Sequence, residues 1–332
     1  MRGSTITSWA LLVAKALDGS GHDSASVFQR AGLDPAKLSN PDARYPIEGM
    51  RRLWQLAVEV TRDPYFGFEA ARYWHPTTLN ALGYSWMASD SLHDALLRMS
   101  RYGRLVSSVA RMTLEESENE IGFSIETPMP APMVVDEAVD AALATLVRMC
   151  RVSYGEKFDP LRVVTHRPPL EEPARYYDFF RAPVEFSAPR NVLYFGKDIL
   201  ERHLPTANPR LARVSDQVVT EYLARFDKGS TAIRVRAKLI DLLSAAQFSQ
   251  QDVADSVHMS LRTLQRKLAE ENTSYKEILE ETRRELANQY LRQGYLSVSE
   301  VTYLLGFSEP SNFARAFKRW TGRTPSEFRA AA

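Results

Sequence analysis

Two clusters of arginine and amide side chains near the C-terminal end of the sequence have a spacing that suits contact with nucleic acid. Arg262, Gln265 and Arg266 lie three and four positions apart, so they share one face of a helix. A second cluster repeats this spacing with Ser311, Asn312, Arg315 and Arg319. In the major groove of DNA, arginine can bind guanine through two hydrogen bonds, and glutamine or asparagine can bind adenine. Nearby cations and a hydroxyl are suited to phosphate oxygens, at Ser260, Lys267, Lys318 and Arg319.

The two clusters occur in two copies of one local pattern, which we place at residues 250–268 and 299–319. In each copy a small residue, Ala254 or Thr302, allows a second helix to cross the first closely. The second helix of each copy has an apolar stripe for packing, formed by Leu261, Leu264 and Leu268 or by Phe313, Phe317 and Trp320. One copy alone could be an ordinary solvated helix face. Two copies of this helix-turn-helix pattern, joined by one amphipathic helix, favour DNA binding.

The turn inside each copy requires a residue that tolerates a positive φ angle. Gly306 does so without steric cost, and His258 holds the matching position in the first copy. Ser260 is suited to cap the helix that follows the first turn. In the second copy Ser308 could cap, with Glu309 in the first turn and Pro310 at an early helical position.

A single amphipathic helix is predicted between the two copies. Apolar residues recur at helical spacing from Ser274 to Leu291, and Gly294 is suited to end the helix. A rigid connector of this kind can hold two recognition helices about 34 Å apart, which is one turn of DNA. One molecule would then read two successive segments of the major groove.

Residues Thr231 to Arg329 resemble the DNA-binding domain of the AraC/XylS family of bacterial transcription regulators. The resemblance rests on the second copy, in which Gly-Phe, Phe-x-x-x-Phe-Lys-Arg and Thr-Pro-x-x-Phe-Arg follow one another between residues 306 and 329. The sequence departs from the family at His258, where family members usually have glycine. The resemblance implies base contacts from Arg262, Gln265, Arg266, Ser311, Asn312 and Arg315.

The first two hundred residues are predicted to form an α+β domain, with helices first and a small sheet later. Helical periodicity predicts helices at 6–17, 24–31, 46–63, 66–74, 79–87, 92–106, 134–152 and 175–180. Alternating or short apolar runs predict strands at 109–114, 120–126, 161–165, 184–186 and 192–195.

Several short motifs in residues 7–204 resemble the effector-binding domain of one AraC subgroup, which includes the ornithine-utilisation regulators. They include Leu33-Asp-Pro, Leu82-Gly-Tyr84 and Pro183-Val-x-Phe186. The resemblance implies a small-molecule effector, without ranking an amino acid, a fatty acid or an aromatic metabolite. Aromatic residues that could line its pocket, although such spacings are more often those of a core, are Trp54, Tyr84, Trp86, Tyr102 and Phe123.

The composition of the chain excludes several features that other classes of protein have. The net charge is +1, so the placement of arginines matters more than bulk charge. Cys150 is the single cysteine, which excludes an internal disulfide and a thiolate metal site, and its apolar surroundings indicate a buried thiol. No stretch approaches the roughly 20 apolar residues of a membrane span, and the segment after Trp9 lacks a signal-peptide cleavage pattern. We therefore expect a cytoplasmic protein with no membrane partner.

We expect an effector domain at residues 1–205, a connector at 206–229 and a DNA-binding domain at 230–332. The connector contains a predicted helix from Arg210 to Phe226, with apolar residues along one side at Leu211, Val214, Val218, Val219 and Leu223. This helix could close the first domain or pair with a second protomer.

Catalytic, metal and cofactor sites are not expected. His75, His93, His166 and His203 lack the spacing that metal sites favour, and the sequence contains no phosphate-binding glycine loop or nucleophile elbow. The sequence thus predicts an α+β effector domain followed by an all-α DNA-binding domain with two helix-turn-helix motifs and a linker helix. The resemblance implies an activator that binds promoter DNA, an effector and RNA polymerase as a homodimer. Alternatives are an effector-independent regulator, a repressor, or a metabolite-transforming enzyme with a DNA-binding tail.

Overall fold

A computed structural model of the protein describes residues 3–127, 134–226, 231–243, 248–271, 273–292 and 296–330. The chain divides into two compact units, Met1–Val219 and Thr220–Ala332. This division falls inside a helix, so the boundary expected near residue 229 stays a prediction. Residues 227–229 of the expected connector and the expected helix end at Gly294 lie outside the described residues. No helix in the described ranges is long and apolar enough to cross a membrane.

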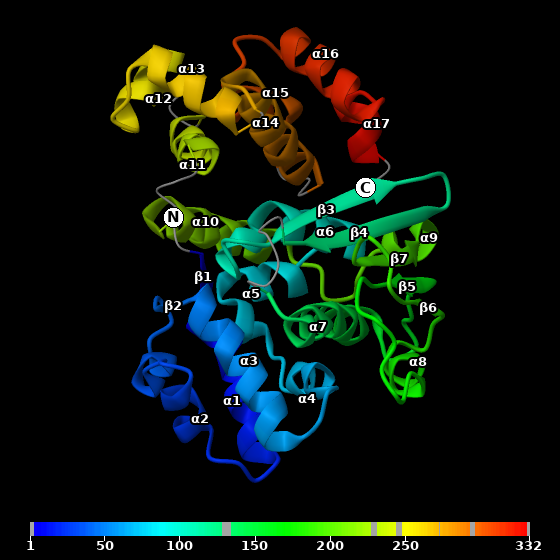
Figure 1. Ribbon diagram of the computed structural model, residues 1–332. Coiled ribbons are helices and arrows are strands. Elements are labelled where there is room, and N and C mark those ends of the chain that lie inside the picture. Colours follow the sequence, from blue (N-terminus) through cyan, green and yellow to red (C-terminus); the bar gives the residue numbers. More distant parts are fainter. Residues whose placement is uncertain are drawn as a thin grey trace. The chain divides into compact units, whose positions relative to one another are not determined.

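The first part of this unit is mainly helical, as expected, and its α-helices start within two residues of their predicted positions. Figure 1 shows these elements. These elements are β1 (Ser4–Ile6), α1 (Thr7–Gly19), α2 (Ser24–Arg30), η1 (Pro35–Ser39), β2 (Arg44–Pro46), α3 (Ile47–Thr61), α4 (Phe66–Arg72), η2 (Pro76–Leu79), α5 (Ala81–Met87), α6 (Leu92–Tyr102) and η3 (Gly103–Leu105). The antiparallel pairing of β1 with β2 was not predicted, because three-residue strands are too short to show alternation.

The second half of the first unit contains a five-stranded sheet with the strand order β3-β4-β7-β5-β6. Its elements are β3 (Arg111–Glu116), β4 (Glu120–Glu126), α7 (Asp136–Tyr154), β5 (Arg162–Val164), α8 (Ala174–Phe180), β6 (Val184–Glu185), β7 (Val192–Gly196), α9 (Lys197–Leu200) and α10 (Pro209–Phe226). Neighbouring strands are antiparallel except β5 and β6, which are parallel. The five strands expected in this region are all present, and the predicted α+β class is confirmed.

Helix α7 is central to the packing of the first unit. Gly67 of α4 lies so close to α7 that an added Cβ atom would come within 2.5 Å of the Glu137 carbonyl oxygen. Cys150 of α7 is fully buried, as the sequence indicates. Helices α3, α4, α6 and α8 all contact α7. Another face of α7 lines a cavity inside the first unit.

A buried polar cluster attaches α7 to the segment between β5 and α8. Arg167 pairs with Asp140, and its Nη2 atom donates to Glu137 Oε1 at 2.9 Å. The Tyr176 hydroxyl donates to Asp140 Oδ2 at 2.8 Å. Asp140 is 1% exposed and Arg167 is 4% exposed, so removal of either charge would leave the other buried without its main partner.

The first part of α10 is attached to the first unit by polar contacts. Asp216 accepts a hydrogen bond from Ser85 and another from Arg98 Nε, the latter at 3.0 Å. The predicted apolar side of this helix is not one buried stripe. Val219 and Leu223 are buried, whereas Leu211, Val214 and Val218 are 45–48% exposed, because the helix turns these two groups toward different directions.

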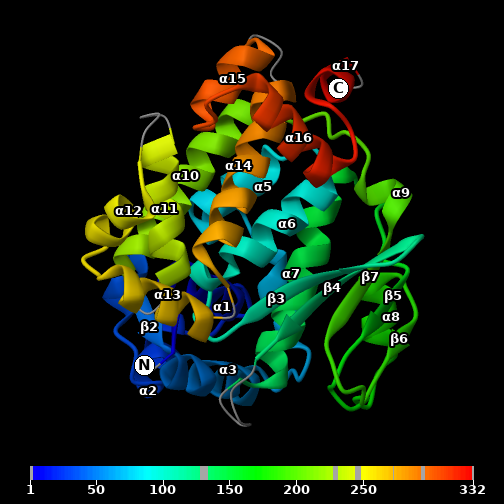
Figure 2. The ribbon, with the colours of Figure 1, turned by 90° about the horizontal axis from the view of Figure 1, so that it is seen from above.

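The second unit is helical throughout its described ranges, and the predicted all-α class is confirmed. After α10 it contains α11 (Thr231–Leu243), α12 (Gln250–Ser256), α13 (Leu261–Glu270), α14 (Tyr275–Arg292), α15 (Val298–Leu304), α16 (Pro310–Thr321) and α17 (Pro325–Ala330). Helix α14 lies between a group formed by α11–α13 and a group formed by α15–α17 (Figure 2). The helix predicted at 274–291 is therefore confirmed as the connector of two motifs.

Each helix-turn-helix motif has a hydrophobic core of its own, and α14 contributes to both. Ile278, near the start of α14, packs with Val253, Leu264 and Leu268 of the first motif. Ala287 and Leu291, near its end, pack with residues of the second motif, which include Val301, Phe313 and Phe317. One continuous helix thus fixes the orientation of both motifs.

Candidate nucleic-acid interface and ligand cavity

The turns of the two motifs have the same backbone conformation. His258 has a φ angle of 58° and Gly306 has a φ angle of 67°, so both adopt the left-handed region. Each turn connects a short first helix to its recognition helix, α12 to α13 and α15 to α16. The expectation that these two positions correspond is confirmed, and the histidine does not alter the type of turn.

Capping groups fix the ends of the helices in both motifs. Ser260 accepts a hydrogen bond from the Thr263 N–H at 3.2 Å, as its predicted N-cap role requires. The N-cap of α16 is Glu309 and its side chain makes no capping bond, so the role expected of Ser308 is wrong; Pro310 does lie at the first helical position. The first helices both begin with a capping box, Ser249 with Asp252 and Ser297 with Glu300, a repeated Ser-x-x-acid signal that the sequence analysis overlooked.

Recognition helix α13 presents the first predicted cluster to solvent. Arg262, Gln265 and Arg266 are exposed, whereas Leu264 and Leu268 on the opposite side are fully buried. Arg266 forms an ion pair with Glu270 one turn later. The helix thus has a buried stripe and a free polar face, the division that a groove-binding helix needs.

Recognition helix α16 has the same division. Ser311 and Arg315 are exposed and Asn312 is half-buried, while Phe313 and Phe317 are fully buried. Arg315 Nη2 donates to Asn312 Oδ1 at 2.7 Å, so these two side chains are held together on one face. The structure therefore places each set of predicted base-contacting residues on one outer face of its helix.

The four side chains expected at phosphates lie around the recognition helices. Lys318 is exposed, Lys267 is half-buried, and exposed Ser260 lies at the start of α13. Exposed Arg319 donates from Nη2 to Glu280 Oε1 of α14 at 2.6 Å. An exposed ion pair of this kind contributes at most about 1 kcal/mol, so it can be exchanged for a phosphate contact.

Arginine side chains that the sequence analysis did not single out hold the turns in place. Arg283 of α14 donates from Nε to the Leu305 carbonyl at 2.9 Å and from Nη2 to the Gly306 carbonyl at 3.0 Å. Its guanidinium carbon also lies 4.5 Å from the centre of the Phe307 ring. Burial lowers the pKa of Arg283 from its ordinary value. An arginine among the apolar positions of α14 was a signal for such a buried contact.

The turn of the first motif is held by a similar arginine contact, which comes from α11 and not from α14. Arg234 of α11 donates to the Val257 carbonyl, directly before His258. The carboxylate of Glu271 in turn accepts from the backbone N–H groups of Thr231 and Ala232, at 2.5 and 3.0 Å, at the start of α11. Each turn is thus attached to a long helix by an arginine that binds its carbonyl groups.

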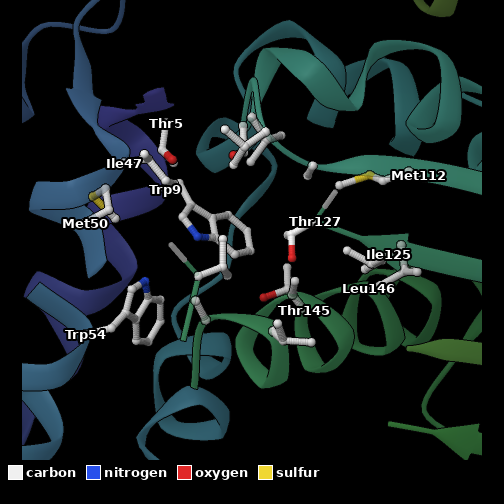
Figure 3. Close-up of a pocket in the computed structure, with 18 of the residues that line it drawn as sticks. Thr5, Trp9, Ile47, Met50, Trp54, Met112, Ile125, Thr127, Thr145 and Leu146 are labelled. Carbon is white, nitrogen blue, oxygen red and sulfur yellow. The ribbon is translucent and has the colours of Figure 1, made fainter. Parts of the chain in front are cut away.

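A separate cavity of about 100 Å³ lies inside the first unit. Its walls come from α1, α3, β3, β4 and α7 (Figure 3). Most of the lining is apolar, and the side chains around it include Trp9, Met50, Trp54, Ile125 and Leu146. A concave, mainly apolar site with a few polar groups is the usual form of a small-molecule site.

Two of the five aromatic residues proposed for an effector pocket line this cavity, namely Trp54 and Phe123. Tyr84 is 44% exposed and lies outside the lining. Trp86 is fully buried and donates to Ser153 Oγ at 3.1 Å, and Tyr102 is buried in the core. Trp9, Met50 and the lining residues of α7 were not predicted, because they are distant from one another in the chain.

The polar groups of the cavity are few. Arg51 donates to both carboxylate oxygens of Glu48, at 2.6 and 3.1 Å, and these hydrogen bonds lower the pKa of Glu48. The remaining polar groups are the hydroxyls of Thr5, Ser107, Thr127 and Thr145 and the indole N–H groups of Trp9 and Trp54. Among the described residues, no group of three or more His, Cys, Asp or Glu side chains could hold a metal ion.

Comparison with known proteins finds family matches for both parts of the chain. Residues 21–204 match the family described as the arabinose-binding domain of AraC transcription regulators, and residues 253–331 match a helix-turn-helix domain. The chain is 28% identical over 307 residues to the ornithine utilization regulator of Pseudomonas aeruginosa, with 92% of this chain and 90% of that protein covered. It is 26% identical over 316 residues to the transcriptional regulator VirS of Mycobacterium tuberculosis, covering 93% and 92%.

Among solved structures, the transcriptional regulator CdpR of Pseudomonas aeruginosa matches 92% of this chain and 96% of its own, at 22% identity and a TM-score of 0.46. The names of the Pseudomonas aeruginosa and Mycobacterium tuberculosis relatives are those of regulators, which agrees with the exposed recognition helices of the second unit. The chain belongs to the AraC family of transcription regulators, with a DNA-binding helix-turn-helix region after an arabinose-binding-type N-terminal domain.

Proposed function

We propose that this regulator binds a specific promoter site with α13 and α16 and that a small molecule in the cavity of the first unit controls the binding. The observation that carries the DNA-binding part is the matched pair of recognition helices on one connector. Both have an arginine-bearing face exposed and an apolar face buried, and both follow a turn of the same conformation.

In this proposal, Arg262, Gln265 and Arg266 read bases in one major-groove segment, and Ser311, Asn312 and Arg315 read bases in the next. Ser260, Lys267, Lys318 and Arg319 contact phosphates. Arg266, Arg315 and Arg319 are themselves exposed, and in the free protein each is held by a partner that is exposed or half-buried. Such bonds are weak, so DNA can replace them at small energetic cost.

Effector control would follow from linkage between ligand and DNA. A ligand that binds more tightly to the arrangement competent for DNA raises the population of that arrangement, and DNA raises the affinity for the ligand by the same factor. We propose activation through RNA polymerase as the output. The exposed apolar residues Leu211, Val214 and Val218 of α10 are our candidate for the contact of a homodimer.

The test is selection of genomic fragments by the purified full-length protein, followed by titration of the best fragment at two salt concentrations. We expect one discrete site of about two helical turns, bound at least about a thousandfold more tightly than random DNA. Binding without sequence preference, both alone and with extracts of cell metabolites, would contradict the proposal. Reporter transcription from the selected site then distinguishes activation from repression.

A further inference from the structure

The cavity of the first unit contains a buried hydroxyl group that the surrounding protein does not use. Thr145 lies on α7, is 2% exposed and lines the cavity (Figure 3). Its Oγ1 atom is buried and has no hydrogen-bond partner among the described residues. A buried hydroxyl without a partner destabilises a folded protein by about 1–3 kcal/mol, so most such groups are satisfied.

Other threonines in helices of this chain bond to their own helix, whereas Thr145 does not. The hydroxyl groups of Thr61, Thr282, Thr302 and Thr321 each donate to the backbone carbonyl four residues earlier, at 2.7–2.9 Å. Thr282 and Thr302 are as deeply buried as Thr145. A local bond of this kind is available to a threonine in any helix. Thr145 makes no such bond, so its hydroxyl keeps its full hydrogen-bonding capacity in the free protein.

The charges around the cavity argue against an ionic ligand. Arg51 is the cation of the lining, and unlike the single contact of Arg319 it binds both oxygens of the Glu48 carboxylate, so a ligand carboxylate would have to displace a bidentate partner. No aspartate or glutamate is among the described residues that line the cavity. An amino acid would bring an ammonium and a carboxylate into this space without fixed partners, which is strongly unfavourable.

The apolar walls argue equally against a polyol. A sugar places a hydroxyl on most of its carbon atoms, and each needs a hydrogen-bond partner when it is buried. The cavity offers Thr145 and a few other hydroxyl groups, while tryptophan, methionine and aliphatic side chains form most of its wall. These side chains suit an apolar body.

We propose that the cavity binds an uncharged, mainly apolar small molecule whose alcohol or carbonyl oxygen forms a hydrogen bond with Thr145 Oγ1. This inference rests on the proposed role of the cavity as the effector site. It names the class of effector and separates it from amino acids, carboxylates and sugars.

The test uses full-length protein and a series of primary alcohols from 1-butanol to 1-octanol, each compared with the carboxylate of the same chain length. L-Ornithine and L-arabinose represent amino acids and sugars. Calorimetric titration and thermal unfolding are measured for each. We expect saturable binding and a raised Tm with at least one alcohol, at an affinity at least tenfold above that of its carboxylate. Equal or tighter binding of a carboxylate, ornithine or arabinose, or no saturable binding of any alcohol, would overturn the proposal.

Thr145→Val tests the role of the hydroxyl, because valine keeps the shape of the side chain. We expect the variant to bind the best alcohol roughly tenfold more weakly, equivalent to about 1.4 kcal/mol, and to have an unchanged or higher Tm without ligand. Thr61→Val is the matched control, since its hydroxyl already donates to Ala57 and lies outside the cavity lining. It should lose stability and keep its affinity for the alcohol. Unchanged alcohol affinity in Thr145→Val would refute the assignment.

Titration of the selected promoter fragment is carried out in parallel, so that two possible failures can be distinguished. Specific DNA binding without alcohol binding refutes the proposed ligand class and leaves the regulator function intact. Alcohol binding that leaves DNA affinity unchanged supports the ligand class and contradicts effector control.

Discussion

His258 and Gly306 occupy matching positions in the two turns, and both have a left-handed backbone, with φ angles of 58° and 67°. A residue with a Cβ atom is strained in this region, whereas glycine is not. The first motif therefore contains a local strain that the second motif lacks. Its retention of the same geometry shows that the contacts around the turn, including the bond from Arg234 to the Val257 carbonyl, are strong enough to hold it.

Replacing His258 by glycine should stabilise the second unit by about 0.5–1 kcal/mol, because it removes the steric conflict at positive φ. Chemical denaturation measures the change. His258→Ala is the control and should give no such gain, since alanine keeps the Cβ atom. An equal gain from both variants would show that the imidazole, and not the backbone, causes the strain.

Removing Arg283 should destabilise the second motif by about 2 kcal/mol, because the two carbonyl groups of Leu305 and Gly306 would lose a charged donor. Arg283→Met keeps most of the apolar stem of the side chain. The matched control is Arg284→Met, next along α14 and exposed. Denaturation of both variants gives the comparison. Equal stability of the two would mean that the Arg283 contacts contribute nothing.

Substitutions of the proposed base-reading residues and of the proposed phosphate-binding residues should change promoter binding in different ways. Arg266→Ala and Arg315→Ala are each expected to weaken binding by about 1–3 kcal/mol and to relax preference at one or two base positions. Lys318→Ala should weaken binding to all sequences alike and reduce the salt dependence by about one phosphate contact. Titrations at several salt concentrations with mutated sites measure both.

The control for these variants is Arg30→Ala, which removes an exposed arginine of the first unit that pairs with Glu59. Its promoter affinity and salt dependence should match those of the original protein. If Arg266→Ala and Arg315→Ala also leave affinity and base preference unchanged, the predicted base contacts are wrong.

The stability of the first unit should depend on pH through Asp140. Burial raises the pKa of this carboxyl group from 3.8 to about 6. Between about pH 4 and pH 6 the folded protein therefore binds a proton that the unfolded chain releases, so this group makes stability fall as the pH rises. The stability contributed by Asp140 should therefore decrease as the pH rises across this range.

Denaturation of the original protein and of Asp140→Asn at several pH values checks this result. The asparagine cannot ionise, so the variant should lack that part of the pH dependence. If stability depends on pH in the same way in both proteins, Arg167 and Tyr176 keep the pKa of Asp140 in the folded protein near its ordinary value.

Cys150 should be unreactive toward thiol reagents while the protein is folded. The thiol is fully buried, and burial raises its pKa, so almost no thiolate forms near neutral pH. We expect no reaction with a maleimide in buffer and one equivalent of reaction in denaturant. Rapid reaction of the folded protein would show that α7 opens readily.

The sequence was most informative where one pattern determined one element. Residues 120–126 alternate between apolar and polar side chains, and β4 has those same bounds. The buried stripes of α13 and α16 could be predicted because helical spacing determines which side chains share a face. The exposure of Arg262, Gln265, Arg266 and Arg315 follows from the same periodicity.

Features that depend on distant parts of the chain could not be predicted in this way. The cavity combines walls from α1, α3, β4 and α7, and nothing in their local sequences indicates that they meet. Hence Trp54 and Phe123 were proposed together with three aromatic residues that lie elsewhere. The unused hydroxyl of Thr145 is a further example, since its sequence context does not distinguish it from a threonine that donates to its own helix.

The shared helix α14 has a consequence for how operator spacing can change. Ile278 belongs to the core of one motif, and Ala287 and Leu291 belong to the core of the other. Inserting one residue between them would turn the second motif by about 100° around the helix axis and move it by about 1.5 Å. In the proposed binding mode, the two recognition helices would then no longer meet the same side of a duplex. The length of α14 would therefore set which spacing of base contacts one molecule can reach, and small insertions or deletions within it should abolish specific binding even where every side chain proposed to contact DNA is kept.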